Sequence, residues 1–175
     1  MSTSERKLPS TDVIFIGGGI SALIAALELL RAGRRVTIYE RRRRELLGGQ
    51  CLDAFGGLLF VGSPEQRRLG IRDSVELAWE DWQGYAEFGP DSEHQRAWAR
   101  RYLERCLPDV RSWMRAQGLQ FLPVANWAER ARDGRGNRVP RFHLLWGCGP
   151  ALVRAMLREL ARHEGERLQI VCEHR

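Results

Sequence analysis

The hydrophobic positions near the amino terminus predict a strand, a helix and a second strand in close succession. Residues 12–16 form a short apolar run that stops at consecutive glycines, which is typical of a buried strand entering a tight turn. Residues 20–31 carry apolar side chains at helical spacing, and Gly33 stands where a helix C-terminal cap belongs. Residues 35–39 read as the next strand. The right-handed crossover rule makes the two strands parallel, with the helix covering the sheet.

The remainder of the chain shows the same periodicities less densely. Helices are predicted over 73–83 and 93–117, and Pro108 is expected to divide the longer one. A helix over 151–162 follows a glycine turn, and the apolar run 168–172 is predicted to be a third parallel strand. The fold class is therefore α/β: a Rossmann-like domain with a parallel sheet, incomplete, and a helical insertion at about 73–118.

The domain is expected to span 12–175, after a flexible amino-terminal segment at 1–11. Its predicted sheet has only three strands and ends on an open edge, so the chain reads as an amino-terminal fragment truncated at its carboxyl end.

The glycines after the first strand match the pattern of a turn that binds a dinucleotide, and each has a physical role in such a turn. In the pattern Gly17-x-Gly19-x-x-Ala22, the first glycine permits a sharp turn and the second admits a pyrophosphate close to the backbone. Ala22 allows tight helix packing. The free N–H groups at the helix start form an anion site, with the positive end of the helix dipole behind them. These candidate donors are Ile20, Ser21 and Ala22.

An acidic residue completes the dinucleotide pattern. Glu40 ends the second strand, 18 residues past Ala22, where it is placed to accept both hydroxyls of an adenosine ribose. The same charge would repel a 2′-phosphate. The alternatives are a glycine turn that merely packs and a P-loop, and the latter is disfavoured because no Gly-Lys-Ser/Thr follows the turn.

Composition narrows the class without naming a chemistry. The chain has 175 residues, of which 43% are hydrophobic and 29% charged, as expected for a globular domain. It has no apolar run long enough to cross a bilayer and no secretory signal at its start, so a cytoplasmic location and no membrane partner are predicted. The cysteines lack paired short spacings, so we expect free thiols and no metal site.

The net charge of +6 does not by itself indicate a nucleic-acid partner, because arginines and acids are mixed along the predicted helices. The one cationic run, Arg41 to Arg44, lies directly after a predicted strand. It is a solvated loop, a contributor to a nucleotide phosphate site, or a nucleic-acid contact, and the sequence leaves these alternatives open. Arg41 is included among the candidate cofactor-binding residues.

Two glycine pairs after Glu40 extend the pattern beyond a plain NAD domain. They are Gly48-Gly49, followed by Gln50 and Cys51, and Gly56-Gly57, and both read as loop residues that approach more ligand. At this point the chain resembles the FAD-dependent oxidoreductases of the fumarate reductase and succinate dehydrogenase flavoprotein group, in its ketosteroid-dehydrogenase-like branch. Further segments that carry the resemblance are 13–21, 63–67, 127–130, 139–143 and 146–150.

The resemblance implies FAD as the cofactor and a Rossmann-like FAD-binding domain. By that similarity Ser21 and Ala22 meet the pyrophosphate and Glu40 the ribose. Gly49, Gln50 and Cys51 then lie toward the ribityl chain, and Gly56 and Gly57 near the flavin ring. Relatives that tether FAD covalently carry a histidine six residues before the second glycine pair, where this chain has Gln50. The FAD is therefore expected to be non-covalent.

Aromatic and titratable residues further along receive no catalytic assignment. The six tryptophans are expected to be mostly core, and one helix face is expected to bury Trp98, Tyr102, Cys106, Val110 and Trp113. His143 is interpreted as a packed or surface residue rather than an acid or base. Arg141 faces an anionic group or solvent.

Three functional hypotheses follow. The chain is the FAD-binding part of an oxidoreductase that hydrogenates or dehydrogenates a carbon–carbon bond next to a carbonyl of a small-molecule substrate. Alternatively, it is a nucleotide-binding module without turnover of its own. A third hypothesis makes it an NADP protein with Arg41 to Arg44 around the 2′-phosphate, and Glu40 argues against that.

Overall fold

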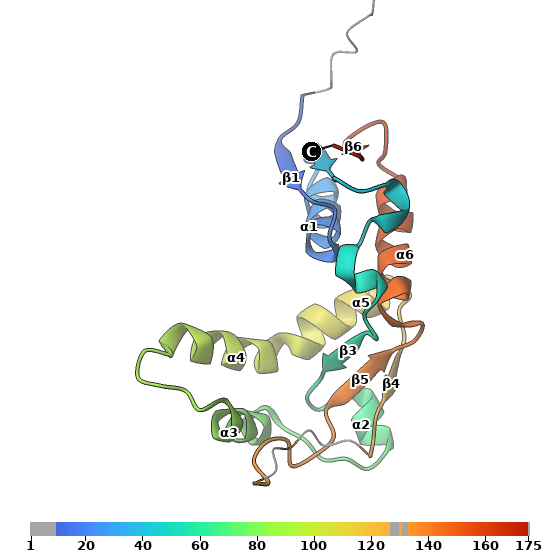
Figure 1. Cartoon of the computed structure of the whole chain (residues 1–175). Coiled ribbons are helices and arrows are strands. Elements are labelled where there is room, and N and C mark those ends of the chain that lie inside the picture. Colours follow the sequence, from blue (N-terminus) through green and yellow to red (C-terminus); the bar gives the residue numbers. More distant parts are fainter. Residues whose placement is uncertain (1–9, 127–129, 131–132, 175) are drawn as a thin grey trace, which may run out of the picture. The chain divides into compact units, whose positions relative to one another are not determined.

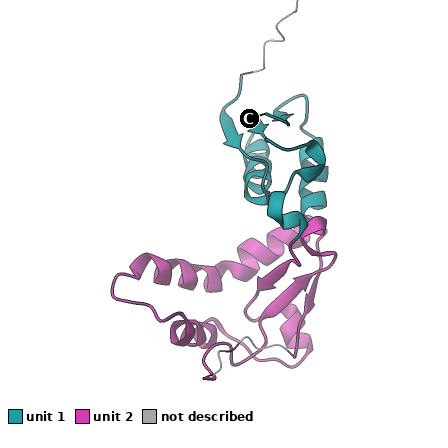
Figure 2. Ribbon diagram, viewed as in Figure 1, with its two compact units in different colours: residues 1–53, 152–175 teal, residues 54–151 magenta. Residues whose placement is uncertain are grey.

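The computed structural model describes residues 10–126, 130 and 133–174, and these form two compact units. Figure 2 colours the units separately: one joins residues 10–53 with 152–174, and the other comprises the described residues of 54–151. Most of the predicted flexible segment 1–11 lies outside the described residues. The predicted single domain over 12–175 stays a prediction.

The first unit is built on a parallel sheet of three strands in the order β1-β2-β6. Val13 pairs with Val36, which in turn pairs with Leu168. The parallel sheet is therefore confirmed, third strand included. The elements of this unit are β1 (Val13–Ile16), α1 (Ile20–Arg31), β2 (Val36–Tyr39), the 3₁₀ helices η1 (Arg44–Leu46) and η2 (Gly49–Leu52), most of α6 (Cys148–Ala161), and β6 (Leu168–Val171).

Helix α1 forms because its apolar residues fall on one face. The helix packs against β2, and its buried residues recur at helical spacing: Leu23, Ala26, Leu27 and Leu30. Figure 1 shows α1 next to β1. Gly33, directly after the helix, has a φ of +79°, which favours glycine, and its N–H donates to the carbonyl of Leu30. The strand, helix and strand order predicted from the sequence is confirmed.

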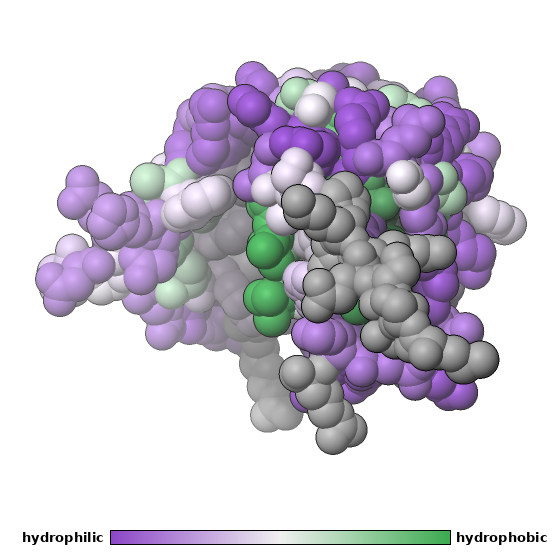
Figure 3. Space-filling view, turned by 90° about the horizontal axis from the view of Figure 1, so that it is seen from above, coloured by the Kyte–Doolittle hydropathy of each residue, from purple (hydrophilic) through white to green (hydrophobic). Residues whose placement is uncertain are grey.

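On one face of this sheet, the edge strand β1 exposes two apolar side chains. Ile14 and Ile16, whose side chains point away from the helix-covered face, are 53% and 86% exposed. Parallel sheets are normally covered on both faces. Figure 3 shows hydrophobic side chains reaching the surface within a mostly hydrophilic exterior.

The second unit contains an antiparallel sheet that the sequence analysis did not predict. Its three strands stand in the order β3-β5-β4, and Leu58 pairs with His143. Helix α2 packs against β4, as Figure 1 shows. The elements of this unit are β3 (Gly57–Leu59), α2 (Pro64–Arg68), α3 (Val75–Ala86), α4 (Glu93–Arg105), the π-helix η3 (Cys106–Arg111), α5 (Ser112–Ala116), β4 (Phe121–Pro123) and β5 (Phe142–Leu145).

The predicted helices exist, with different bounds. The long helix is interrupted at residue 106, and Pro108 lies inside the wider π-helical turn, because proline has no N–H to continue the α-helical pattern. Helix α6 begins at Cys148, earlier than the predicted residue 151, since Gly147 adopts a φ of +81° and Pro150 suits a first helical turn.

The expectation that most tryptophans are core is wrong for two of them. Trp98 is 77% exposed and Trp146 is 66% exposed, while Trp79, Trp82 and Trp113 are half-buried. Trp127 lies outside the described residues. The buried stripe of α4 is shifted by one position from the predicted one, because Ala99 and Leu103 point inward, in line with Cys106.

Within the described residues, each helix is too short or too polar to traverse a lipid bilayer. The cytoplasmic location stays a prediction.

Candidate cofactor site

The glycine turn between β1 and α1 leaves open space beside the backbone. Gly17 has a φ of +99°, and its N–H donates to the carbonyl of Tyr39 over 2.7 Å. A Cβ added at Gly17 or Gly19 would meet nothing within 4 Å. Gly19 is the N-cap of α1, and no side chain caps this helix start. The turn therefore offers the room and the backbone donors of Ile20, Ser21 and Ala22 that a pyrophosphate needs.

Gly18, the middle glycine, was treated as a free position in the sequence pattern, and the structure gives it a role. A side chain there would collide with Leu47, and its Cβ would lie 3.2 Å from a carboxylate oxygen of Glu40. Its N–H donates to Glu40 Oε2 over 2.7 Å. The signal in the sequence was the run of consecutive glycines, which exceeds what the dinucleotide pattern requires.

Glu40 is a fixed, ionised carboxylate next to this turn. The residue is 8% exposed, and its second oxygen, Oε1, accepts the N–H of Arg42 over 2.8 Å. The N–H of Gly18 is the main cause that lowers the pKa of Glu40 below its usual range. Each oxygen keeps a further lone pair for a donor. The arrangement suits ribose hydroxyls and opposes a 2′-phosphate.

The first glycine pair after β2 lies against the glycine turn. The N–H of Gly48 donates to the carbonyl of Gly18 over 2.8 Å, and Gly19 and Gly48 form an isolated parallel bridge. Gly48 has a φ of +98°, and a Cβ there would lie 2.7 Å from Cγ1 of Val153. Gly49 would place a Cβ 3.7 Å from the Cα of Gly19. Two glycine motifs far apart in the sequence thus meet in one unit.

Gln50 and Cys51 follow on η2, close in sequence to this contact. Gln50 is exposed and Cys51 is half-buried. Burial raises the pKa of the Cys51 thiol, so it is protonated at neutral pH. None of the four cysteines, all of which the structure describes, forms a disulfide. The structure brings Gly48, Gly49, Gln50 and Cys51 into the unit that contains the glycine turn and Glu40.

The cationic run after Glu40 has mixed surroundings. Arg44 pairs with Glu164, with NH1 2.7 Å from Oε1, and so ties the loop after β2 to the residues that follow α6. Arg41 is exposed, and its side chain has no hydrogen-bond or ion-pair partner within the part of the chain that the structure describes.

Residues 12–175 match the family model described as an FAD binding domain. The chain belongs to this family. FAD is therefore its cofactor, and the open glycine turn, the helix start and the ionised Glu40 fit the ADP end of that molecule. The NADP hypothesis receives no support.

The FAD-binding domain is similar to curated proteins called KsdD-like steroid dehydrogenases. One from Mycolicibacterium smegmatis is 46% identical over 172 residues, which is 96% of this chain and 31% of that protein. One from Mycobacterium tuberculosis is 48% identical over 161 residues, which is 90% of this chain and 28% of that protein. The chain thus spans about a third of the length of these relatives.

A solved structure shares the fold. The 3-ketosteroid-delta4-(5alpha)-dehydrogenase from Rhodococcus jostii, in complex with 4-androstene-3,17-dione, superposes with a TM-score of 0.69 at 20% identity. The match covers 98% of this chain and 40% of that chain. The Rossmann-like FAD-binding fold is confirmed.

Gly56 and Gly57 belong to the other unit of the FAD-binding domain. Gly56 has a φ of +75° and its carbonyl accepts the N–H of Leu145 over 2.9 Å. Gly57 opens β3 rather than lying in a loop, and a side chain there would collide with the ring of Phe142. Close packing explains these glycines locally, and their place near the flavin ring stays a prediction.

His143 and Arg141 are both buried, with 0% and 1% exposure. His143 donates from Nδ1 to the carbonyl of Arg141 over 2.8 Å and accepts the hydroxyl of Ser63 at Nε2 over 2.7 Å. Burial lowers the pKa of His143, which keeps the ring neutral. Of the packed and surface positions expected for His143, the structure shows the packed one.

Arg141 faces anionic groups of its own unit, one of the two alternatives left open by the sequence. Its NH2 lies 2.8 Å from Oδ1 of Asp73, and neither side chain is exposed. Its NH1 lies 2.6 Å from Oδ2 of Asp81. The sequence around Arg141 did not indicate this ion cluster, because Asp73 and Asp81 are about 60 residues or more away along the chain.

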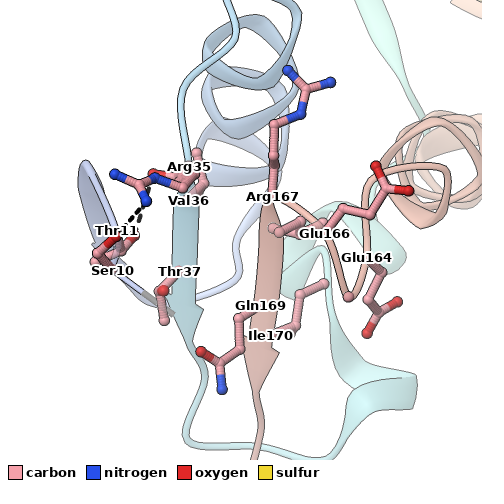
Figure 4. A pocket seen from close by; sticks show the side chains of 12 residues that line it. Ser10, Thr11, Arg35, Val36, Thr37, Glu164, Glu166, Arg167, Gln169 and Ile170 are labelled. Carbon is pink, nitrogen blue, oxygen red and sulfur yellow. Dashed lines mark hydrogen bonds between the residues drawn. The ribbon is translucent and has the colours of Figure 1, made fainter. Parts of the chain in front are cut away.

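A cavity of about 280 Å³ in the first unit is not the cofactor site. Figure 4 shows its lining, which includes Thr11, Arg35 and Arg167. These residues precede β1, β2 and β6, so the cavity lies at the amino-terminal ends of the strands. Ligands of open parallel sheets bind beyond the carboxyl ends, where the glycine turn lies.

Proposed function

We propose that this FAD-binding domain is the cofactor-holding part of an oxidoreductase that adds or removes hydrogen across a carbon–carbon bond next to a carbonyl. The two relatives described above are called KsdD-like steroid dehydrogenases, which supports a ketone of the steroid class as substrate. Bound FAD supplies hydride exchange at flavin N5. The residues of this chain bind and orient the cofactor.

The observation that carries the proposal is the junction of Gly18, Glu40 and Gly48. It brings a charged acceptor, an uncapped helix start and a second glycine motif to one place. We assign the pyrophosphate to the N–H groups of residues 20–22 and the adenosine ribose to Glu40. Arg41, next to Glu40, is assigned to the solvent side of the same nucleotide. Its exposed side chain supports that assignment.

The remainder of the cofactor is assigned by the resemblance. Gly49, Gln50 and Cys51 accompany the ribityl chain, and Gly56 and Gly57 approach the flavin ring. Gln50 stands in place of a tethering histidine, so the FAD is held without a covalent bond.

A second candidate function is a module that binds FAD without turnover. It is favoured by one observation: the junction of Gly18, Glu40 and Gly48 provides contacts for the ADP end of a nucleotide. In this case the chain binds the ADP end of FAD and shows no reaction with ketones.

We place the protein in the cytoplasm, without a nucleic-acid partner. Several exposed arginines are paired with acids on the same surface, so positive and negative charges alternate there rather than forming one basic patch. Examples are the pairs Arg31 with Glu28, Arg105 with Asp109, and Arg135 with Glu87.

The visible spectrum of the purified chain tests the proposal. FAD-loaded protein should absorb near about 450 nm and bleach on anaerobic reduction. After acid precipitation the flavin should appear in the supernatant. A protein that stays colourless after incubation with FAD contradicts cofactor binding, and flavin that stays in the pellet contradicts non-covalent binding. Bleaching by a saturated 3-ketosteroid separates the oxidoreductase from the module.

A further inference from the structure

A cavity of about 300 Å³ in the second unit combines apolar walls with a phenol at its edge. Leu59 on β3, Trp82 and Tyr85 on α3, and Gly136 and Asn137 form its lining together with Asp81. The volume is at the lower end of the range seen for small-molecule sites. It suits one ring system, or one end of a larger molecule.

Tyr102 contacts both Leu59 and Trp82, the two residues that form the apolar wall of the cavity. Tyr102 on α4 donates its hydroxyl to the carbonyl of Leu59 over 2.9 Å. The rings of Trp82 and Tyr102 meet edge to face at 6.4 Å. Burial raises the pKa of Tyr102 to about 12, so this donor keeps its proton at any physiological pH. The wall is therefore present before a ligand arrives.

The floor is fixed by ion pairs whose charges are already satisfied. Asp81 is 6% exposed, accepts the N–H of Arg138 over 2.9 Å and pairs with Arg141 over 2.6 Å. Asn137 Oδ1 accepts from the same guanidinium over 2.7 Å. A carboxylate engaged in this way does not demand a cationic ligand, and the floor is compatible with a neutral molecule.

Tyr85 is the one lining group with a hydroxyl left to donate. It is 57% exposed, and it has no hydrogen-bond partner within the described residues. A phenol at the mouth of an apolar pocket recognises a carbonyl oxygen, because the O–H donates while the ring covers the adjoining apolar surface.

We propose that this cavity binds the carbonyl-bearing ring of an apolar polycyclic ketone, with Trp82 packing on the ring and Tyr85 donating to the carbonyl oxygen. This inference rests on the proposed function, and it adds the place and the donor by which the ketone is held. Tyr85 is a positioning residue for the carbonyl. Discrimination between a ketone and its deoxygenated analogue comes from this one hydrogen bond.

Equilibrium dialysis with FAD-loaded chain tests the proposal. The probes are 4-androstene-3,17-dione and 5α-androstane, which has the ring skeleton without either carbonyl. Trp82→Ala should weaken binding of both probes by at least about tenfold, because the ring loses an apolar wall. Tyr85→Phe should weaken only the diketone, by about threefold to tenfold, and so abolish the preference for it. Trp98→Ala removes an exposed tryptophan outside the cavity and should change neither affinity.

The outcomes separate the two proposals. Absence of bound flavin contradicts the proposed function, whereas flavin-loaded chain that binds no diketone overturns the cavity assignment alone. Diketone binding that survives both Trp82→Ala and Tyr85→Phe also overturns it, since the ligand then lies elsewhere. Trp82 is half-buried, so a circular dichroism spectrum checks that Trp82→Ala is folded, and Trp82→Phe gives a more conservative variant for the same binding measurement. Tyr85 is exposed, so Tyr85→Phe is expected to fold normally and its effect on binding can be read directly.

Discussion

Glu40→Gln is expected to weaken FAD binding. Both carboxylate oxygens accept backbone N–H groups, from Gly18 over 2.7 Å and from Arg42 over 2.8 Å. A glutamine offers one oxygen and one NH₂ group. Whichever way the amide turns, an N–H donor faces another donor, and the negative charge is lost.

The size of the effect follows from these contacts. A hydrogen bond to a charged group contributes about 1.5–3 kcal/mol, so loss of one should lower the free energy of unfolding by roughly that amount. The ribose hydroxyls lose a charged acceptor as well. A loss of the same size in binding corresponds to a Kd for FAD that is about tenfold to a hundredfold higher.

Flavin fluorescence titration at pH 7 measures the affinity, and urea unfolding of the unloaded chain measures the stability. Glu45→Gln is the matched control, since Glu45 is an exposed acid in the same loop. It should change the Kd by less than about twofold. The reasoning is refuted if the Kd of the Glu40 variant stays within twofold of the unmodified chain, or if both variants weaken binding equally.

Three further substitutions test the structure itself, each against a matched control in urea unfolding. Gly48→Ala should lower the free energy of unfolding by roughly 2–4 kcal/mol, because the φ of Gly48 is +98° and an added Cβ would meet Val153. Gly70 has a φ of +72° and open space around it, so Gly70→Ala should lower the free energy of unfolding by only about 1 kcal/mol. Equal costs would contradict the contact with α6. Asp73→Asn should lower the free energy of unfolding by about 3–5 kcal/mol, because the buried Arg141 loses one of its negatively charged partners. Glu76→Gln is the control: its pair with Arg100 is exposed, and the loss should be under about 0.5 kcal/mol. A small effect at Asp73 would mean that the cluster is hydrated. Burial holds the pKa of His143 below its usual 6.5, so as the pH falls the unfolded chain binds a proton at this histidine before the folded chain does. The free energy of unfolding should therefore fall as the pH drops through 6.5 towards 5, by at most about 2 kcal/mol. His143→Gln should remove that part of the pH dependence and the exposed His94→Gln should not, and a slope unchanged by the first variant would refute the assignment.

The part of the fold that could be predicted from the sequence is the part that is local. The run before Gly17, the helical spacing of Leu23 to Leu30 and the cap at Gly33 each lie within a few residues of the contacts they make. The antiparallel sheet escaped prediction because its strands have 3 or 4 residues and pair across long separations, as Leu58 does with His143.

The candidate site divides in the same way. The glycine turn and Glu40 follow from spacing, but the contact between Gly18 and Gly48 depends on how the loop after β2 folds back. Arg141 could not be recognised as buried, because its partners Asp73 and Asp81 come from a different part of the chain.

Competition against bound FAD tests most directly whether residues 12–53 hold the ADP end of the cofactor. The purified chain is loaded with FAD and titrated separately with ADP, adenosine 2′,5′-bisphosphate and FMN, and flavin release is followed by fluorescence. The account predicts that ADP displaces FAD, while the 2′-phosphate analogue is excluded by Glu40 and FMN competes weakly or not at all. Displacement by FMN, or by the 2′-phosphate analogue as readily as by ADP, would contradict it.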